Sequence, residues 1–283
     1  MMSILINLNK EGLVSDMKIG FIGGGAMGEA LLSGVLSNGS LAPKDVFVSE
    51  IREDRCQELK DKHGVNAVTD NDFVKNAGLD ILILAVKPQV ATDVMTSLKG
   101  KVSDDVLVGS IVAGLPIKTL EKYFPSNPIV RIMPNTPLAV GEGMSAYARN
   151  ERASGKATVK AIRDILYACG QAVEVKESMM DAVTGLSGSG PAYGFLMIDA
   201  MADGGVAAGL PRQTAILLAA QTLLGAAKMV VETGKHPDVL RDQVTSPAGT
   251  TIAGVRVMEQ QGVRGALIDA VLAATERSKE LGK

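Results

Sequence analysis

Aromatic side chains, cysteine and histidine are scarce in this sequence of 283 residues, and tryptophan is absent. Aromatic residues make up only 3% of the chain, which argues against a protein that stacks nucleic acid bases on aromatic rings. With only two cysteines (Cys56, Cys169) and two histidines (His63, His236), a Cys/His zinc cluster and a disulfide framework are excluded, and we expect no metal. So few thiols indicate a reducing compartment, and we expect a cytoplasmic protein.

The sequence also lacks an excess of charge and a long apolar run. Lys and Arg number 29 against 31 Asp and Glu, so no basic stripe for nucleic acid phosphates is expected. No window reaches the roughly 18 uninterrupted apolar residues of a membrane span, so we expect no membrane partner. Residues 1–16 have neither the basic leader nor the apolar length of a signal peptide, and we expect a flexible N-terminal extension.

The pattern of the remaining chain predicts two domains, because 283 residues exceed one ordinary core. Over residues 17–175, short apolar runs alternate with helical patterns, which is typical of an α/β domain with a doubly wound parallel sheet. Over residues 176–283 the pattern is all-helical and rich in small residues. Its apolar surface exceeds what a monomer of this helix count buries, so we expect a homodimer that shares these helices. The strands are expected at 18–23, 46–48, 67–68, 80–86, 106–111 and 130–133.

A glycine-rich turn follows the first predicted strand and opens a helix. The motif Gly23-x-Gly25-x-x-Gly28 has the spacing and the setting of a dinucleotide-binding (Rossmann-type) fingerprint. In this fingerprint the first glycine makes a tight turn, the second lets backbone approach a pyrophosphate, and the third lets helix pack on strand. The free N–H groups at the helix start bind the phosphates. The motif therefore predicts a nicotinamide dinucleotide site.

The identity of the cofactor stays open at this point. Glu50 ends the second predicted strand, where an acidic side chain binds the ribose hydroxyls of NAD. Its neighbours Ser49 and Arg52 would instead suit the 2′-phosphate of NADP. A third interpretation makes Glu50 a solvated strand end. NADH and NADPH are both consistent with these residues.

Two later strand ends face the same crevice, because ligands of parallel sheets bind outside the carboxyl ends of the strands. The segments Ala85–Pro88 and Ile111–Gly114 have small residues that would let a flat nicotinamide lie against backbone. Lys87 is either a catalytic cation or, as we favour, a polar residue on the rim. Asn135, after the sixth strand, either binds the carboxamide of the nicotinamide or caps a turn.

The segment Thr245–Thr251 (TSPAGTT) precedes an apolar helix in the second domain. Hydroxyl groups and free N–H groups at the positive end of a helix can hold a carboxylate. The alternative is an ordinary N-cap, which composition alone favours. Both interpretations of this segment remain open.

Five segments resemble the pyrroline-5-carboxylate reductase family and occur in that family's order. They are KIGFIGGGAMGEAL, ILAVKPQ, VRIMPNTP, GLSGSGPAY and VTSPAGTTIAG, and the match runs from Met17 to about Leu281. The resemblance implies reduction of the cyclic imine 1-pyrroline-5-carboxylate to L-proline with NADPH or NADH, the last step of proline biosynthesis. It also implies a homodimer through the C-terminal helices, and it leaves a ring of such dimers open.

The resemblance further implies a site for each ligand. The substrate site comprises Ser246, Ala248, Gly249, Thr250 and Thr251, with Thr251 as the catalytic residue beside the ring nitrogen. The cofactor site comprises Ile22, Gly23, Gly24, Gly25, Ala26, Met27, Glu50, Asn71, Ala85, Val86, Lys87, Pro88, Ile111, Val112 and Ala113. The chain departs from the family at Glu50, where Ser or Asn is frequent, and at Ala248, where Gly is common. If position 248 needs a positive φ, alanine costs free energy there.

The chemistry of an imine agrees with the scarcity of histidine. A protonated imine already carries the charge that activates it, so hydride addition needs no strong acid. We expect His63 in a surface segment and His236 just before a short helix, so neither is a candidate acid. A β-hydroxyacid dehydrogenase-type oxidoreductase is the alternative enzyme, but the helix after its glycine-rich turn carries a lysine that Pro191–Leu196 lacks. A non-catalytic NAD(P)H-binding redox sensor is the other alternative, and it predicts no need for Ser246 and Thr251.

Overall fold

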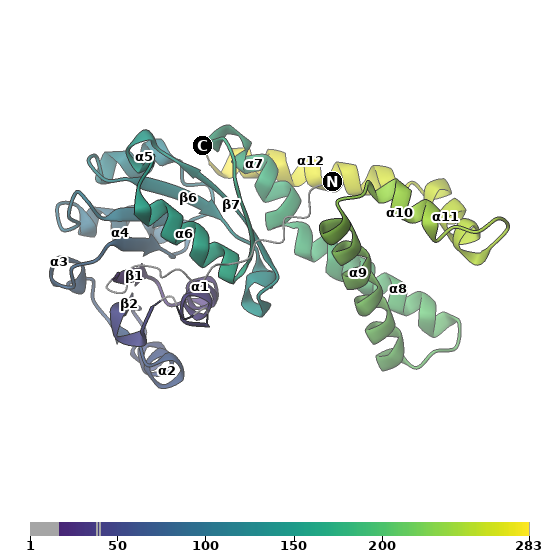
Figure 1. Cartoon of the computed structure of the whole chain (residues 1–283), viewed down its shortest axis with the longest axis horizontal. Coiled ribbons are helices and arrows are strands. Elements are labelled where there is room, and N and C mark those ends of the chain that lie inside the picture. The colour runs from purple at the N-terminus through teal and green to yellow at the C-terminus, as the bar shows by residue number, and fades with distance from the viewer. Residues whose placement is uncertain (1–16, 38, 40, 283) are drawn as a thin grey trace. The chain divides into compact units, whose positions relative to one another are not determined.

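The computed structural model describes residues 17–37, 39 and 41–282 (Figure 1). They form two compact units. Residues 189–273 make up the helical unit, and residues up to Gly188 together with Ala274 onward make up the α/β unit. The predicted N-terminal extension, residues 1–16, lies outside the described residues.

A single eight-stranded sheet forms the centre of the α/β unit. Its order is β3-β2-β1-β4-β5-β6-β7-β8. The first six strands are parallel, β7 is antiparallel to β6, and β8 is parallel to β7. This confirms the doubly wound sheet. The strands are β1 (Ile19–Ile22), β2 (Val46–Ser49), β3 (Asn66–Val68), β4 (Ile81–Leu84), β5 (Leu107–Ser110), β6 (Ile129–Met133), β7 (Gly143–Arg149) and β8 (Gly170–Glu174).

Helices cover both faces of this sheet, so each central strand is buried on both sides. In β4, Ile81 and Ile83 join the core on one face, whereas Leu82 and Leu84 join the core on the other. The first core also holds residues of α1 (Ala26–Ser37), α2 (Glu53–His63) and α6 (Ala157–Ala168), and the second holds residues of α4 (Pro88–Leu98) and α5 (Ile117–Tyr123). The short helix α3 (Phe73–Asn76) follows β3.

Both cysteines are free and buried in the first of these cores. The Cys56 thiol donates to the backbone oxygen of Glu50 over 3.1 Å. Burial raises the pKa of the Cys169 thiol to about 11. Both thiols are therefore held in the protonated, unreactive form at neutral pH.

Five helices make up most of the C-terminal region, as the sequence predicts. They are α8 (Gly190–Ala207), α9 (Arg212–Thr233), α10 (Pro237–Gln243), α11 (Thr250–Gln260) and α12 (Val263–Leu281). Pro191 lies in the first turn of α8, and Gly234 ends α9 with a φ of +62°. Helices α8 and α9 pack closely, since a Cβ on Gly205 would lie 3.1 Å from Ala215.

The apolar stretch of α9, residues 215–231, has the composition of a buried helix, but most of it is exposed in the single chain. Only Ala215 and Ala219 are buried, whereas Leu217 is 68% exposed and Val231 is 70% exposed. The small alanines let one side of α9 pack against α8, and its larger apolar side chains point elsewhere. By length and composition alone this helix could cross a membrane.

The boundary between the compact units lies later than the predicted boundary at 175/176, because residues 177–188 bond to the α/β unit. The Glu177 carboxylate accepts from the N–H of Ile117 over 2.6 Å and pairs with Arg131 at 3.3 Å. The end of α12 bonds there too, where the Ser278 hydroxyl donates to Asp181 over 2.7 Å. The intervening segments are a 3-10 turn (Glu177–Met179), α7 (Met180–Val183) and a π-helical turn (Thr184–Gly188).

Candidate functional site

The carboxyl ends of five neighbouring strands bring the predicted cofactor residues together. The N–H of Ala85 donates to the oxygen of Ile22 over 2.8 Å, and the N–H of Gly23 donates to Ser49 over 2.8 Å. On the other side of β4, the N–H of Ile111 donates to Leu84 over 3.0 Å. The chain leaves β1 toward β2 and later returns to place β4 on the opposite side of β1. This edge is therefore the switch point at which ligands of such sheets bind.

The glycine turn has the geometry that each of its three glycines predicts. Gly23 has a φ of +106°, and a Cβ there would lie 2.5 Å from the backbone oxygen of Ala85. Gly28 lies in α1, and a Cβ there would lie 2.5 Å from the backbone oxygen of Gly23, so α1 packs tightly on the turn. Gly25, in contrast, has no atom within 4 Å of its Cβ position. The turn thus leaves open space beside the helix start, as the dinucleotide-binding fingerprint predicts.

A cleft of about 430 Å³ lies beside this turn. Glu50 lines it and joins the end of β2 to the turn, because the N–H of Gly24 donates to its carboxylate over 3.0 Å. The N–H of Arg52 donates to the other carboxylate oxygen over 3.2 Å. Glu50 is thus fixed at the cleft rather than being a free, solvated strand end. The lining comprises Gly25, Ala26, Glu29, Glu50, Arg52, Arg55 and Glu58.

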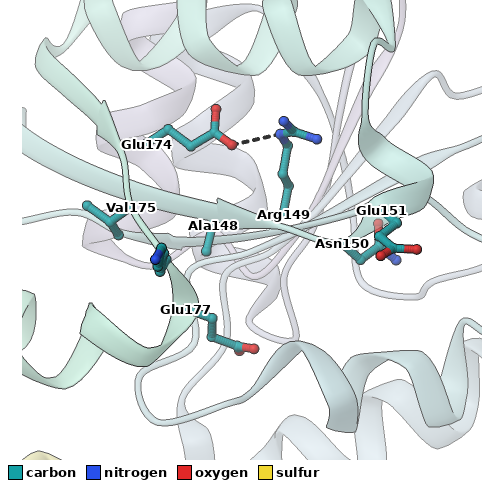
Figure 2. Close-up of a pocket in the computed structure, with 8 residues that line it drawn as sticks. Ala148, Arg149, Asn150, Glu151, Glu174, Val175 and Glu177 are labelled. Carbon is teal, nitrogen blue, oxygen red and sulfur yellow. Dashed lines mark hydrogen bonds and ion pairs between the residues drawn. The ribbon is translucent and has the colours of Figure 1, made fainter.

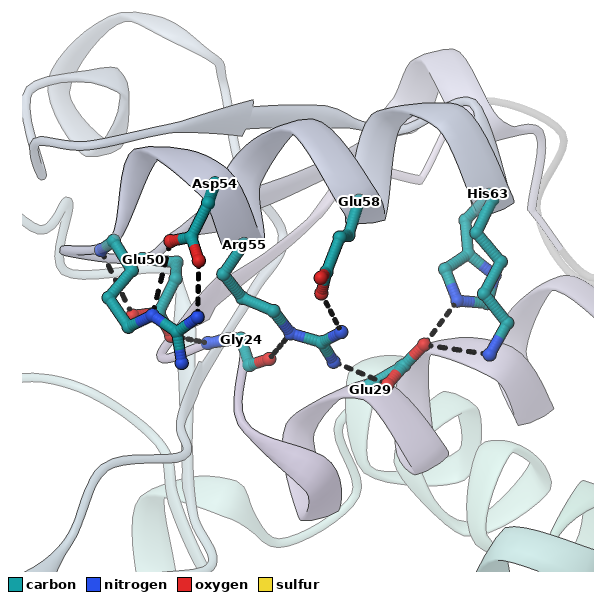
Figure 3. Close-up of polar contacts among 9 residues, drawn as sticks. Gly24, Glu29, Glu50, Asp54, Arg55, Glu58 and His63 are labelled. Atoms are coloured by element: carbon teal, nitrogen blue, oxygen red, sulfur yellow. Dashed lines mark hydrogen bonds and ion pairs between the residues drawn. The ribbon is translucent and has the colours of Figure 1, made fainter.

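An ionic cluster that the sequence pattern did not predict lies on this cleft. The Arg55 guanidinium donates to the oxygen of Gly24 over 3.0 Å and also bonds Glu29 and Glu58 (Figure 3). His63 lies in the surface helix α2, as expected, but its side chain is only 10% exposed and contacts Glu29 at 2.9 Å. The spacing of Arg52 and Arg55, one turn apart at the start of α2, was the available signal.

The charge of Glu29 follows from these contacts. Burial by itself would raise the pKa of this carboxyl. Hydrogen bonds from His63, Arg55 and Lys62 outweigh burial and lower the pKa of Glu29 to about 2. Glu29 is therefore charged at neutral pH and anchors Arg55, which in turn bonds to the glycine turn.

Asn71, after β3, has an unsatisfied polar atom of the kind that a bound ligand would pair, although it is not in the lining of this cleft. Its side-chain oxygen is buried and has no hydrogen-bond partner among the described residues. Its amide nitrogen reaches only the Ser97 hydroxyl, at 3.5 Å. An unpaired buried acceptor costs about 1–3 kcal/mol, which a hydroxyl or amino donor of a bound ligand would recover.

Two further predicted residues have local roles in the structure. Lys87 is exposed and precedes α4 without a side-chain cap bond, which agrees with a polar residue on the rim. Asn135 is partly buried and makes no side-chain cap bond to the turn that follows it. Its side-chain amide nitrogen donates to the backbone oxygen of Ser187 over 3.0 Å, and its side-chain oxygen accepts from the N–H of Met144 over 2.8 Å. Asn135 therefore connects three backbone segments.

A second cleft, of about 500 Å³, lies at the ends of β7 and β8 (Figure 2). Residues 148–151 and 174–177 line it, and an ion pair of 2.7 Å between Arg149 and Glu174 spans it. The predicted cofactor residues are not in this lining, which also lacks a glycine turn at a helix start. Although it is the larger cleft, its residues do not match the predicted chemistry.

The segment Thr245–Thr251 forms the turn between α10 and α11 in the helical unit. Gly249 is the N-cap of α11, so the ordinary N-cap weighed as the alternative is present, without a side-chain cap bond. The Thr245 hydroxyl instead donates to the oxygen of Arg241 over 2.7 Å. The N–H groups in the first turn of a helix have no intrahelical partner. Those of Thr250 and Thr251 therefore suit a carboxylate.

Ala248 in this turn has a φ of +56° and is the one non-glycine residue with a positive φ in the described part of the chain. This conformation costs a residue with a Cβ about 1 kcal/mol. We therefore predict that Ala248→Gly raises the free energy of unfolding by about 0.5–1 kcal/mol. Urea denaturation of both proteins would measure the difference. Ala253→Gly, in the interior of α11, is the control and should lower the free energy of unfolding.

Comparisons with known proteins find matches to both the α/β region and the helical region of the chain. A family model described as "NADP oxidoreductase coenzyme F420-dependent" matches residues 18–114. A second, "Pyrroline-5-carboxylate reductase dimerisation", matches residues 177–281. A pyrroline-5-carboxylate reductase of Methanosarcina acetivorans is 48% identical over 271 residues, which cover 95% of this chain and 100% of that protein.

Solved structures agree with the sequence relatives. A pyrroline-5-carboxylate reductase of Coxiella burnetii is 36% identical with a TM-score of 0.87, covering 95% of this chain and 100% of that chain. The pyrroline carboxylate reductase of Plasmodium falciparum, solved with NADP bound, is 34% identical with a TM-score of 0.83. That match covers 95% of this chain and 99% of the other.

Proposed function

The chain belongs to the pyrroline-5-carboxylate reductase family, and we propose how its own residues perform the reaction. The enzyme reduces 1-pyrroline-5-carboxylate to L-proline by hydride transfer from NADPH or NADH, the last step of proline biosynthesis. The observation that carries this function is 48% identity over nearly the whole chain, with the glycine turn in the geometry that a dinucleotide needs.

The α/β unit provides the cofactor site in this proposal. The open side of Gly25 and the start of α1 receive the pyrophosphate. Glu50 and Asn71 contact the adenosine end, because both lie at the carboxyl ends of strands on the β2 side of the switch point. The backbone of Ala85–Pro88 and Ile111–Ala113 faces the nicotinamide, which supplies the hydride when bound.

The turn before α11 provides the substrate site. The carboxylate of the substrate accepts hydrogen bonds from the N–H groups at the start of this helix and from the Ser246 hydroxyl. Thr251 is the catalytic residue, and its hydroxyl accepts the N–H of the protonated ring. Ala248, Gly249 and Thr250 shape this turn and its amides.

This arrangement works by orientation rather than by acid catalysis. The iminium nitrogen is already charged, and hydride addition to the neighbouring carbon leaves a neutral amine. A proton donor of shifted pKa is therefore not required. Thr251 only has to orient the substrate ring toward the nicotinamide. This explains how a chain with two histidines carries out the reaction.

The enzyme is a homo-oligomer with a small-molecule substrate. We place its dimer contact on the helices of residues 176–283, because Leu196, Leu217 and Val231 are each about 70% exposed in the single chain. The apolar surface of α9 then packs against the partner subunit rather than lipid. A ring of dimers and a cytoplasmic location complete the proposal, the latter supported by two free cysteines.

Oxidation of NADH and NADPH in the presence of 1-pyrroline-5-carboxylate tests the reaction directly. Loss of absorbance at the nicotinamide band with formation of proline supports it, and no turnover with either cofactor rejects it. Light scattering tests the assembly: a dimer or larger is expected, and Leu217→Lys should shift it toward monomer. A monomeric wild-type protein would contradict the interface.

A further inference from the structure

We propose that Glu50 makes this enzyme prefer NADH to NADPH, an inference that rests on the proposed cofactor site. The two cofactors differ only in a 2′-phosphate on the adenosine ribose. In this fold that group lies at the end of β2. The residue there is a carboxylate that two backbone N–H groups hold in place (Figure 3).

The position of Glu50 is fixed by the same turn that receives the pyrophosphate. Its two oxygens accept from Gly24 at 3.0 Å and from Arg52 at 3.2 Å, so the side chain cannot leave without breaking both bonds. Each carboxylate oxygen keeps a second lone pair. Ribose hydroxyls can donate to these lone pairs, whereas a phosphate has no proton to donate and repels the carboxylate.

The arginines beside Glu50 do not offer a free cation for a 2′-phosphate. Arg52 is paired through its side chain with Asp54, and Arg55 is paired with Glu29 and Glu58 (Figure 3). The Arg55 guanidinium is also held by the oxygen of Gly24 over 3.0 Å. To bind the phosphate, either arginine would have to abandon a carboxylate of this chain.

The net charge of the cleft favours the same cofactor. Three carboxylates and two guanidiniums line it, and Asp54 adds another negative charge through Arg52. A phosphate of charge near −2 therefore enters a region that is already negative. NADH adds no charge at this point and places two hydroxyl donors there.

The first experiment measures binding of each cofactor to the wild-type protein without substrate. Isothermal titration with NADH and with NADPH should give a dissociation constant at least 10-fold lower for NADH. Competition with AMP and with adenosine 2′,5′-bisphosphate should follow the same order, because these probes lack the nicotinamide. Equal or tighter binding of NADPH overturns the inference, even if the enzyme reduces its substrate.

The second experiment assigns the preference to Glu50. In Glu50→Gln the ratio of the two dissociation constants should fall at least 5-fold, mainly through tighter NADPH binding. Glu53→Gln is the matched control, since it removes an equal charge from the first turn of α2 outside the cleft lining. The ratio of dissociation constants in Glu53→Gln should stay at the wild-type value. An equal change of this ratio in both variants would show a general effect of charge and would contradict the assignment to Glu50.

The two proposals fail separately. Absence of binding by both cofactors contradicts the cofactor site itself. Normal binding without reduction of 1-pyrroline-5-carboxylate contradicts the reaction and leaves the preference standing. Glu50→Gln can lose stability, because the substitution weakens the bond from the N–H of Gly24. In that case the ratio of the NADH and NADPH dissociation constants of the wild-type protein still decides the inference.

Discussion

Thr251→Ala is expected to lower kcat about 100-fold while the dissociation constants of NADH and NADPH stay unchanged. A single well-placed hydrogen bond to a reacting group contributes on this scale. The hydroxyl is lost from the first turn of α11, but the N–H groups there remain to bind the carboxylate. Steady-state kinetics with saturating cofactor would measure kcat, and titration of the cofactor alone would measure its binding.

Two further variants make this result specific. Thr251→Ser keeps a hydroxyl and should recover most of the lost activity. Thr233→Ala, at the C-terminal end of α9, removes a hydroxyl that bonds the oxygen of Met229, and it should not affect kcat. Wild-type kinetics in Thr251→Ala would remove this residue from the catalytic site, while loss of activity in Thr251→Ser would point to its methyl group instead.

Gly25→Val is expected to weaken binding of both cofactors at least 100-fold without changing the melting temperature by more than a few degrees. Nothing lies within 4 Å of the Cβ position, so the folded chain has room for the side chain. The pyrophosphate needs that same space. Titration of NADH and NADPH, together with thermal unfolding of the apoprotein, would separate binding from stability.

Gly28→Ala provides the contrast for this experiment. Its new methyl group would meet the backbone oxygen of Gly23 at 2.5 Å, so both stability and binding should fall. If Gly25→Val bound cofactor normally, the glycine turn could not be the pyrophosphate site. If it unfolded, the open space beside Gly25 would be smaller than the structure indicates.

Much of this site follows from local sequence patterns. The glycine spacing predicts three separate backbone environments, and the structure confirms each of them. Strands β1, β4 and β5 also lie within the apolar runs predicted at 18–23, 80–86 and 106–111. Such features depend on residues that are close together in the sequence. Local sequence patterns are therefore enough to predict them.

Other features depend on partners that are distant in sequence. Strands β7 and β8 were missed, because GMSAYAR and GQAVE are not apolar runs and β8 pairs only at the sheet edge. The contacts of Glu29 with Arg55 and His63 join residues more than 25 positions apart. The exposure of α9 in the single chain also does not follow from its helix pattern, which specifies an apolar surface but not what covers it.

The two buried thiols, Cys56 and Cys169, can report local and global unfolding of this protein by their rates of chemical labelling. Without tryptophan, indole fluorescence cannot follow unfolding. Maleimide labelling can, because each thiol must reach solvent before it reacts. Cys56 lies against the backbone of Glu50 and Cys169 lies against Gly34, at separate places in the unit. A ligand that closes the end of β2 should therefore slow labelling at Cys56 more than at Cys169, and mass spectrometry would resolve the two rates.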